Sequence, residues 1–202
     1  MKQLIIIHGW TVFHTDDDFY VYLEHKEYDP FEERKDRKDR LPTQVKDTYQ
    51  VIKPTMPNNK NARYKARKMR FKKIIPYLND DGVVLVGHSL WGIFLLKYLS
   101  ENSFPKKIHQ LHLVAAVLEE QGMPEEEKNL EDFVFDLDAL HTIQDKVTNI
   151  FIYHSTNDPV VPYSQAKKIQ SYLPQAKLIT FTDRGHFNLP EFPELLENIL
   201  HG

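Results

Sequence analysis

Ser89, Asp158 and His186 are the residues of this 202-residue chain whose types and order could carry out nucleophilic catalysis. Each follows a short apolar run, and they lie in the polar motifs VGHSLWG, HSTNDPVVP and TDRGHF. A serine hydroxyl is a weak nucleophile until a histidine accepts its proton, and that histidine needs a carboxylate to orient it. The three residues therefore predict a triad with Ser89 as nucleophile, His186 as general base and Asp158 as orienting acid.

Two backbone N–H groups are candidates for stabilising the oxyanion that such a nucleophile would create. One belongs to Leu90, directly after Ser89 and at the expected start of a helix, where developing negative charge is favoured. The other belongs to Trp10, in the HGW motif that follows the first apolar run. We therefore predict an oxyanion hole formed by the amides of Trp10 and Leu90.

Glycine is concentrated at the same motifs. The chain has seven glycines, and four of them lie in or beside HGW, GHSLWG and RGHF: Gly9, Gly87, Gly92 and Gly185. Glycine is favoured where φ is positive or where two backbone segments approach closely. The clustering predicts tight turns at these motifs and, at Ser89, a sharp turn between a strand and a helix.

Trp91 departs from the expected pattern, because the second residue after such a nucleophile should be small. The next apolar run, Leu111–Val117, carries Ala115 and Ala116 where bulkier residues could stand. We predict that the turn forms and that the indole packs, buried, beside the end of this run. The alternative is that Trp91 forms a wall of an acyl pocket. An ordinary helix continuing through Ser89 would favour a non-catalytic protein instead.

Six apolar runs are the expected strands that position these motifs. They are unbroken and rich in branched residues, which is typical of strands buried on both faces of a parallel sheet. Helical spacing separates them, for instance at Ile93, Leu96 and Leu99, and Ser164 is expected to cap a helix over 165–173. The alternation predicts an α/β fold with a mostly parallel, doubly wound sheet flanked by helices. The runs are Leu4–Ile7, Tyr49–Ile52, Val83–Val86, Leu111–Val117, Ile150–Tyr153 and Leu178–Phe181.

Length and composition indicate how the chain is organised. Apolar residues make up 41% and charged residues 27%, as in a globular protein. The length suits one domain with a sizeable core, so we expect a single domain over 1–202. Residues 15–47 have little periodicity and contain EHKEYDPFEERKDRKDR, which mixes charges of both signs. They are expected to form a charged surface insertion.

Two segments of opposite charge stand out against a net charge of −3. Thr48–Asn79 contains nine Lys or Arg and no acid, whereas Glu119–Asp138 contains nine Asp or Glu and one Lys. One interpretation is two solvated surfaces that roughly balance. The other is a patch for an anionic partner, or a basic face that meets an acidic one in a homo-oligomer or with a protein partner.

The motifs, taken together, resemble a known family. IIIHGW, KPTMPN, VGHSLWG, HSTNDPVVP and FTDRGHFNLPEF, in this order, are similar to the small serine hydrolases of the retinoblastoma-binding protein nine and YdeN type. The resemblance covers most of the chain except the insertion. It implies an α/β-hydrolase fold without a large cap domain, and a catalytic triad of Ser89, Asp158 and His186 in an esterase-like enzyme.

Other chemistries find little support in the sequence. There is no cysteine, no H-E-x-x-H and no nucleotide-binding glycine motif, so we expect no metal and no cofactor. His109 and His112 are three apart on an expected strand and would point to opposite faces, so we do not expect them to share a metal. His8, His88 and His154 lie near the predicted site and are interpreted as packing and hydrogen-bonding residues.

The expected location is cytoplasmic. The absence of cysteine permits a reducing compartment. No apolar run is long enough for the core of a signal peptide or for a membrane span.

The sequence thus predicts a cofactor-free serine hydrolase that cleaves a small or medium carboxylic ester through an acyl-enzyme, with a thioester or an amide as the other candidate substrates. The expected partner is a small-molecule acyl substrate. The alternative is a non-catalytic binding or interaction protein on a hydrolase scaffold. A nucleic-acid binder ranks last, because no stacking platform or recognition motif accompanies the basic segment.

Overall fold

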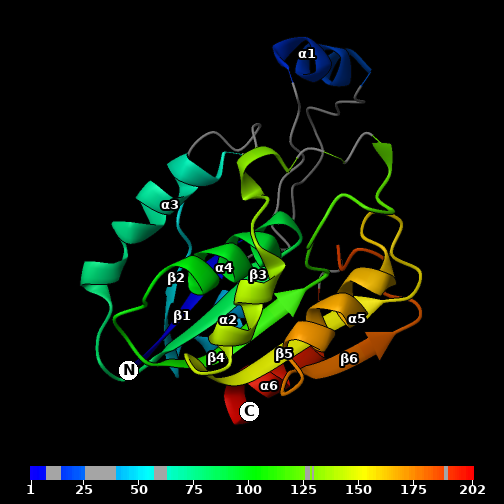
Figure 1. The fold of residues 1–202 in the computed structure, drawn as a ribbon. Helices are drawn as coiled ribbons and strands as arrows, with labels where there is room; N and C mark the ends of the chain where they lie inside the picture. Colours follow the sequence, from blue (N-terminus) through cyan, green and yellow to red (C-terminus); the bar gives the residue numbers. More distant parts are fainter. Residues whose placement is uncertain (8–14, 26–39, 57–62, 126–127, 129, 189–190) are drawn as a thin grey trace.

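Six parallel strands form the centre of the protein (Figure 1). The computed structural model describes residues 1–7, 15–25, 40–56, 63–125, 128, 130–188 and 191–202. The strand order is β2-β1-β3-β4-β5-β6, and every neighbouring pair is parallel, which confirms the predicted sheet. The strands are β1 (Lys2–Ile7), β2 (Tyr49–Ile52), β3 (Val83–His88), β4 (Ile108–Val114), β5 (Val147–Ser155) and β6 (Lys177–Phe181).

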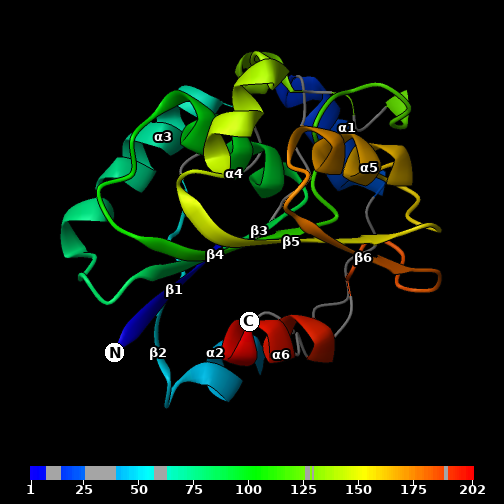
Figure 2. The same cartoon turned by 60° about the horizontal axis from the view of Figure 1, so that its bottom comes forward.

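Helices lie on both faces of this sheet (Figure 2). One face carries α3 (Tyr64–Lys72), α4 (Leu90–Glu101) and α5 (Tyr163–Tyr172), and the other carries α2 (Arg40–Val45) and α6 (Pro193–His201). A buried apolar cluster fills the space on each face, and the larger one surrounds α4. The remaining elements are α1 (Asp16–His25) and the 3-10 helices η2 (Ile75–Tyr77), η4 (Glu131–Phe133) and η5 (Leu137–Ile143).

α4 is buried on all sides. Every residue from Leu90 to Leu99 is buried. A helix that is apolar all round needs neighbours all round, and α4 contacts β3 on one side and η4 and η5 on others. This enclosure fixes the helix that follows Ser89. Within the described ranges, no helix combines the length and the apolar character needed to span a membrane.

The segment 15–47 contains helical structure at both ends, namely α1 and α2. Val45 of α2 is fully buried, and α2 contacts α6 on the second face of the sheet. Residues 26–39, which hold most of the mixed-charge stretch, lie outside the described part of the chain. The single domain over 1–202 and the insertion over 15–47 stay predictions.

Two predicted element boundaries are wrong. The run Leu111–Val117 was expected to be strand throughout, but β4 ends at Val114, and Ala115 has a φ of 43°. The chain leaves the sheet there because the N–H of Val117 donates to the carbonyl of Ser89 rather than to a strand. Ser164 does not cap α5, because the helix begins at Tyr163 and the cap position is Pro162.

The basic and acidic segments meet within one chain. Arg63 forms an ion pair with Glu131. The carboxylate of Asp132 accepts hydrogen bonds from the N–H of Tyr64 at 2.6 Å and from the N–H of Lys65 at 3.1 Å. These are the first N–H groups of α3, whose own preceding side chain makes no capping bond. A carboxylate from a distant part of the chain therefore caps α3, which satisfies orphan donors and favours the helix dipole.

His112 is a fully buried histidine on β4, remote in sequence from the predicted site. Its Nε2 donates to Gln110 Oε1, its Nδ1 accepts from the Tyr153 hydroxyl, both at 3.0 Å, and its ring stacks on Phe151. Burial lowers the pKa of His112 from 6.5 to about 3. Below pH 6.5, His112 therefore binds a proton in the unfolded chain but remains unprotonated in the folded chain until the pH approaches 3.

We predict that the protein loses stability as the pH falls from 6.5 towards 3, with His112 contributing up to about 1.4 kcal/mol per pH unit. In His112→Phe the free energy of unfolding should depend less on pH, because phenylalanine cannot be protonated. Urea unfolding at pH 7, 5.5 and 4 measures it, and His109→Phe, on the same strand but partly exposed, is the matched control. Parallel pH dependence in the wild type and in His112→Phe would contradict the assignment.

Candidate active site

Ser89 occupies a sharp turn between β3 and α4. Its φ is 57° and its ψ is −122°, a backbone conformation that non-glycine residues rarely adopt. Backbone hydrogen bonds hold the turn. The Ser89 N–H donates to Val114, the last residue of β4, at 2.9 Å, and the Ser89 carbonyl accepts from Val117, beyond β4, at 3.3 Å and from Gly92 in α4 at 2.8 Å. Ser89 stands at the cap position of α4, yet its side chain makes no capping hydrogen bond. The predicted strand–turn–helix at Ser89 is therefore present, and the hydroxyl is not used as a cap.

Gly87 and Gly92 permit the close approaches that this turn requires. A Cβ on Gly87 would lie 2.7 Å from the carbonyl oxygen of Trp91. A Cβ on Gly92 would lie 2.3 Å from the Cβ of Ala116 and 2.8 Å from its Cα. The start of α4 thus packs at residue 92 against the chain just after β4, where a residue larger than Ala116 would not fit against Gly92. The expectation that residue 91 needs to be small is wrong for this reason.

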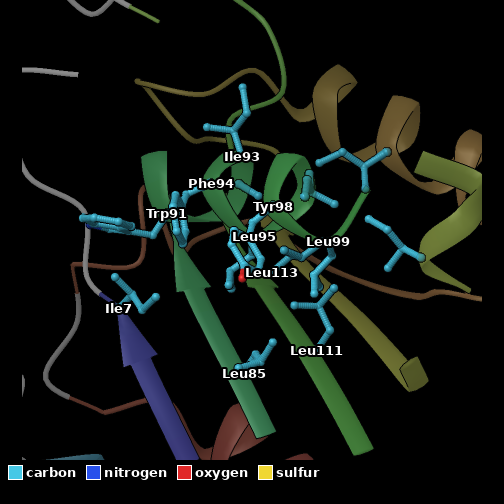
Figure 3. Close-up of a cluster of buried hydrophobic side chains, with 14 of the residues drawn as sticks. Ile7, Leu85, Trp91, Ile93, Phe94, Leu95, Tyr98, Leu99, Leu111 and Leu113 are labelled. Atoms are coloured by element: carbon cyan, nitrogen blue, oxygen red, sulfur yellow. The ribbon is translucent and has the colours of Figure 1, made fainter. Parts of the chain in front are cut away.

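Trp91 is buried, as predicted, with 1% of its surface exposed. The predicted neighbourhood beside the end of β4 is wrong, because Gly92 takes that place. The indole makes an edge contact with Phe94, with ring centroids 5.3 Å apart, and the Arg67 guanidinium of α3 lies 4.6 Å from the indole centre. Figure 3 shows Trp91 beside Phe94 in the same buried cluster as Ile7 at the end of β1. Because the indole has almost no exposed surface, a substrate could make little contact with it.

Asp158 lies in the turn after β5, and its carboxylate is fully buried. Oδ1 accepts from the N–H groups of Val160 at 2.8 Å and Val161 at 3.0 Å. His186 Nδ1 donates to Oδ2 at 2.9 Å, with Oδ1 at 3.1 Å. Burial raises the pKa of Asp158, but the hydrogen bond and charge of His186 and the two amides outweigh it, so that the pKa is lowered overall. The carboxylate is therefore held in its charged form beside the imidazole.

The turn that carries His186 follows β6 and is joined to the turn that carries Asp158. The N–H of Arg184 donates to Ser155 Oγ at 3.1 Å, and the N–H of Gly185 donates to Asn157 Oδ1 at 2.9 Å. Gly185 has a φ of 51°, as the glycine clustering predicted for this motif. Two sites separated by about thirty residues are thus fixed to each other by short side chains. Sequence reasoning missed Ser155 and Asn157, although both stand in the HSTND motif that was singled out for Asp158.

His88 links the turn at Ser89 to the turn at His186. Its Nε2 donates to the backbone carbonyl of His186 at 2.9 Å, and the two imidazole centres are 4.8 Å apart. The interpretation of His88 as a packing and hydrogen-bonding residue is confirmed. Because His88 ends β3, it ties the histidine-bearing turn to the strand that carries Ser89.

The predicted oxyanion donors are only partly within the described chain. Leu90 is the first residue of α4 and is buried, and the first N–H groups of a helix have no partner within the helix. Trp10, with His8 and Gly9, belongs to residues 8–14 and lies outside the described residues. The amide of Trp10 as an oxyanion donor stays a prediction. In the described ranges, no three His, Asp or Glu side chains are grouped closely enough to hold a metal ion.

Comparison with protein families finds one match that covers more than half of the chain. The family model described as serine hydrolase matches residues 76–197. Among curated proteins, the serine hydrolase RBBP9 of Rattus norvegicus is 29% identical over 117 residues. That match covers 58% of this chain and spans 59% of the rat protein's length.

Solved structures resemble the whole chain. The ydeN gene product of B. subtilis has a TM-score of 0.71 at 21% identity, with 99% of this chain and 97% of that chain covered. The bromoperoxidase of Bacillus anthracis has a TM-score of 0.67 at 15% identity, with 98% and 90% covered. The meta-cleavage product hydrolase CumD of Pseudomonas fluorescens IP01 has a TM-score of 0.66 at 15% identity, with 98% and 89% covered. At these identities the likeness shows the fold, and the predicted α/β-hydrolase fold is confirmed.

Proposed function

The chain belongs to the serine hydrolase family, and from this premise we propose that it cleaves a small or medium carboxylic ester through an acyl-enzyme. The observation that carries the proposal is the pairing of His186 Nδ1 with the buried carboxylate of Asp158 at 2.9 Å. The turn of His186 is tied by His88 to β3, the strand that ends directly before Ser89. In the proposed site Ser89 is the nucleophile, His186 the general base and Asp158 the residue that orients it.

The tautomer of His186 supports its role as a base. Its Nδ1 donates to Asp158, so the neutral ring has its free lone pair on Nε2. That lone pair accepts the Ser89 proton as Oγ forms a bond to the acyl carbon. The imidazolium that results is stabilised by the adjacent charged carboxylate. The pKa of Asp158 is lowered, which agrees with a group that stays ionised throughout the cycle.

The remaining steps follow from the same atoms. The carbonyl oxygen takes up the electron pair, and the amides of Leu90 and Trp10 are the proposed donors to it. When the tetrahedral adduct collapses, the bond to the leaving alkoxide breaks, and His186 returns the proton to that alkoxide. A water molecule then gives one proton to His186 as its oxygen attacks the acyl carbon. When this second adduct collapses, the bond to Ser89 Oγ breaks and His186 returns the proton to Oγ. The product leaves as a carboxylic acid, which ionises in water. A thioester or an amide would follow the same steps with a thiolate or an amine as leaving group.

A fluorophosphonate probe tests the proposal directly. The Ser89 oxygen should form a bond to phosphorus while fluoride leaves, and peptide mass mapping should place the adduct on Ser89. An unactivated serine does not react in this way, so Ser164, an exposed serine on α5, is the internal control. A protein that stays unlabelled, or is labelled elsewhere, would contradict the proposal and favour the non-catalytic alternative.

A further inference from the structure

His154 is a second histidine at the Asp158 carboxylate. It is the penultimate residue of β5 and is fully buried. Its Nε2 lies 2.8 Å from the backbone carbonyl of Val161 and 3.6 Å from Asp158 Oδ2. A carbonyl only accepts, so Nε2 carries the proton and donates it to Val161. His154 therefore touches the acid of the proposed triad and the chain segment that wraps around it.

A chain of hydrogen bonds leads from His154 through Val161 to the Asp158 carboxylate and on to His186. The carbonyl of Val161 accepts from His154, while the N–H of Val161 donates to Asp158 Oδ1 at 3.0 Å. The same carboxylate accepts from His186 at 2.9 Å. By holding the carbonyl of Val161, His154 fixes the residue whose N–H orients the carboxylate. Val161 is thus fixed through both of its backbone polar groups: its carbonyl by His154 and its N–H by Asp158.

The other ring nitrogen of His154, Nδ1, does not explain why a histidine stands at this position. Nδ1 is buried and makes no hydrogen bond in the described part of the chain. A buried polar atom without a partner costs free energy, so an apolar ring would fill this space at lower cost. The histidine is explained only by what its Nε2 does.

The surroundings of His154 favour its neutral form. Burial lowers the pKa of His154, and the charge of His186 adds to this effect. The bond to Val161 and the Asp158 carboxylate act in the opposite direction without overcoming it. Besides these groups, the ring faces Tyr163, whose centroid is 6.0 Å away. A neutral donor can hold the turn without competing with His186 for the charge of the carboxylate.

We propose that His154 is a positioning residue, which acts through Val161 to hold the Asp158 carboxylate in the orientation that His186 needs. The inference rests on the proposed function, in which Asp158 orients the base. It assigns to His154 a role beyond the packing and hydrogen bonding expected from the sequence.

Two variants separate the donor from the ring. His154→Phe keeps an aromatic ring and removes the donor, whereas His154→Gln can place an N–H near the position of Nε2. We expect His154→Phe to lower kcat about 10- to 100-fold with KM within about twofold, because a misplaced catalytic group costs rate rather than binding. His154→Gln should restore most of the rate. His112→Phe, which removes another fully buried histidine from the neighbouring strand, controls for general destabilisation.

A spectroscopic readout distinguishes failure of this inference from failure of the proposed function. In the wild type, the proton between His186 Nδ1 and Asp158 should give a downfield NMR signal that is protected from exchange with solvent. His154→Phe should broaden or lose this signal, and His154→Gln should retain it, whether or not any ester is turned over. His112→Phe should leave it unchanged.

Two results would overturn the inference. One is a His154→Phe protein with the kcat and the downfield signal of the wild type. The other is a His154→Gln protein as impaired as His154→Phe, which would assign the effect to the ring. If His154→Phe does not fold, nitrogen NMR of the wild type at pH 8 decides: His154 should be neutral with its proton on Nε2, and a proton on Nδ1 would refute the role.

Discussion

Replacing Ser89 by alanine should reduce the turnover of short p-nitrophenyl esters by a factor of about 10⁴ or more and leave the fold intact. The expected loss is large because Ser89 is the proposed nucleophile, and alanine has no oxygen with which to form the proposed acyl-enzyme. The fold should survive because the Ser89 side chain makes no capping bond, and its strained backbone is held by main-chain hydrogen bonds that alanine retains. Ester hydrolysis measured by absorbance, with circular dichroism of each protein, gives both quantities.

The other two members of the proposed triad should not add to this loss. His186→Ala and Asp158→Asn should each lower activity strongly, yet combining either with Ser89→Ala should change little, because the three residues act as a unit. Ser164→Ala, on the exposed side of α5, is the matched control. Turnover that persists undiminished in Ser89→Ala would remove the assignment.

Much of the sheet could be predicted from the sequence, because strands that are buried on both faces consist of unbroken apolar runs. Each of the six runs contributes a strand to the parallel sheet. The ends of the elements were less predictable. Ala115 and Ala116 continue the apolar run after β4, but the chain leaves the sheet where Ala115 has a φ of 43° and the N–H of Val117 donates to the carbonyl of Ser89. That bond joins segments almost thirty residues apart, which no local pattern encodes.

The long-range contacts of the site were the hardest part to predict. The order of Ser89, Asp158 and His186 could be read from motifs at strand ends, and the pairing of Asp158 with His186 agrees with it. The groups that hold this pair in place could not be predicted from the sequence. They are Asn157, Ser155 and His88, whose side chains form hydrogen bonds with backbone atoms of the turn at His186. The charged segments are a similar case, because a carboxylate at Asp132 reaches the start of α3 only in the folded chain.

The alternative of a non-catalytic protein rested partly on Trp91, and this support is weakened by where the residue lies. The turn at Ser89 forms although position 91 is large, since the close approach to β4 falls on Gly92. Trp91 points instead towards α3 and contacts Arg67. A tryptophan in this position is therefore compatible with the sharp turn that an activated serine requires.

Trp91→Ala should lower the free energy of unfolding by about 3–5 kcal/mol. The indole is among the largest fully buried side chains, and its removal leaves a cavity between α3 and α4. It also deprives the buried Arg67 guanidinium of an aromatic face; the pKa of Arg67 is already lowered to about 10 by burial, so this cation depends on its neighbours. Urea unfolding followed by circular dichroism measures the change. Met69→Ala, an exposed apolar residue on α3, should have little effect.

The same variant distinguishes core packing from a pocket wall. If Trp91 is a packing residue, Trp91→Ala should keep the relative kcat/KM values for acetate, butyrate and octanoate esters, even where all three fall together. If the indole lined the acyl pocket, its removal would make room for longer chains and change their order, while stability would change by less than about 1 kcal/mol. The 1% exposure of Trp91 favours the first result. A small stability change together with an altered chain-length preference would therefore contradict the packing assignment, and would place the acyl pocket on the α3 side of the turn.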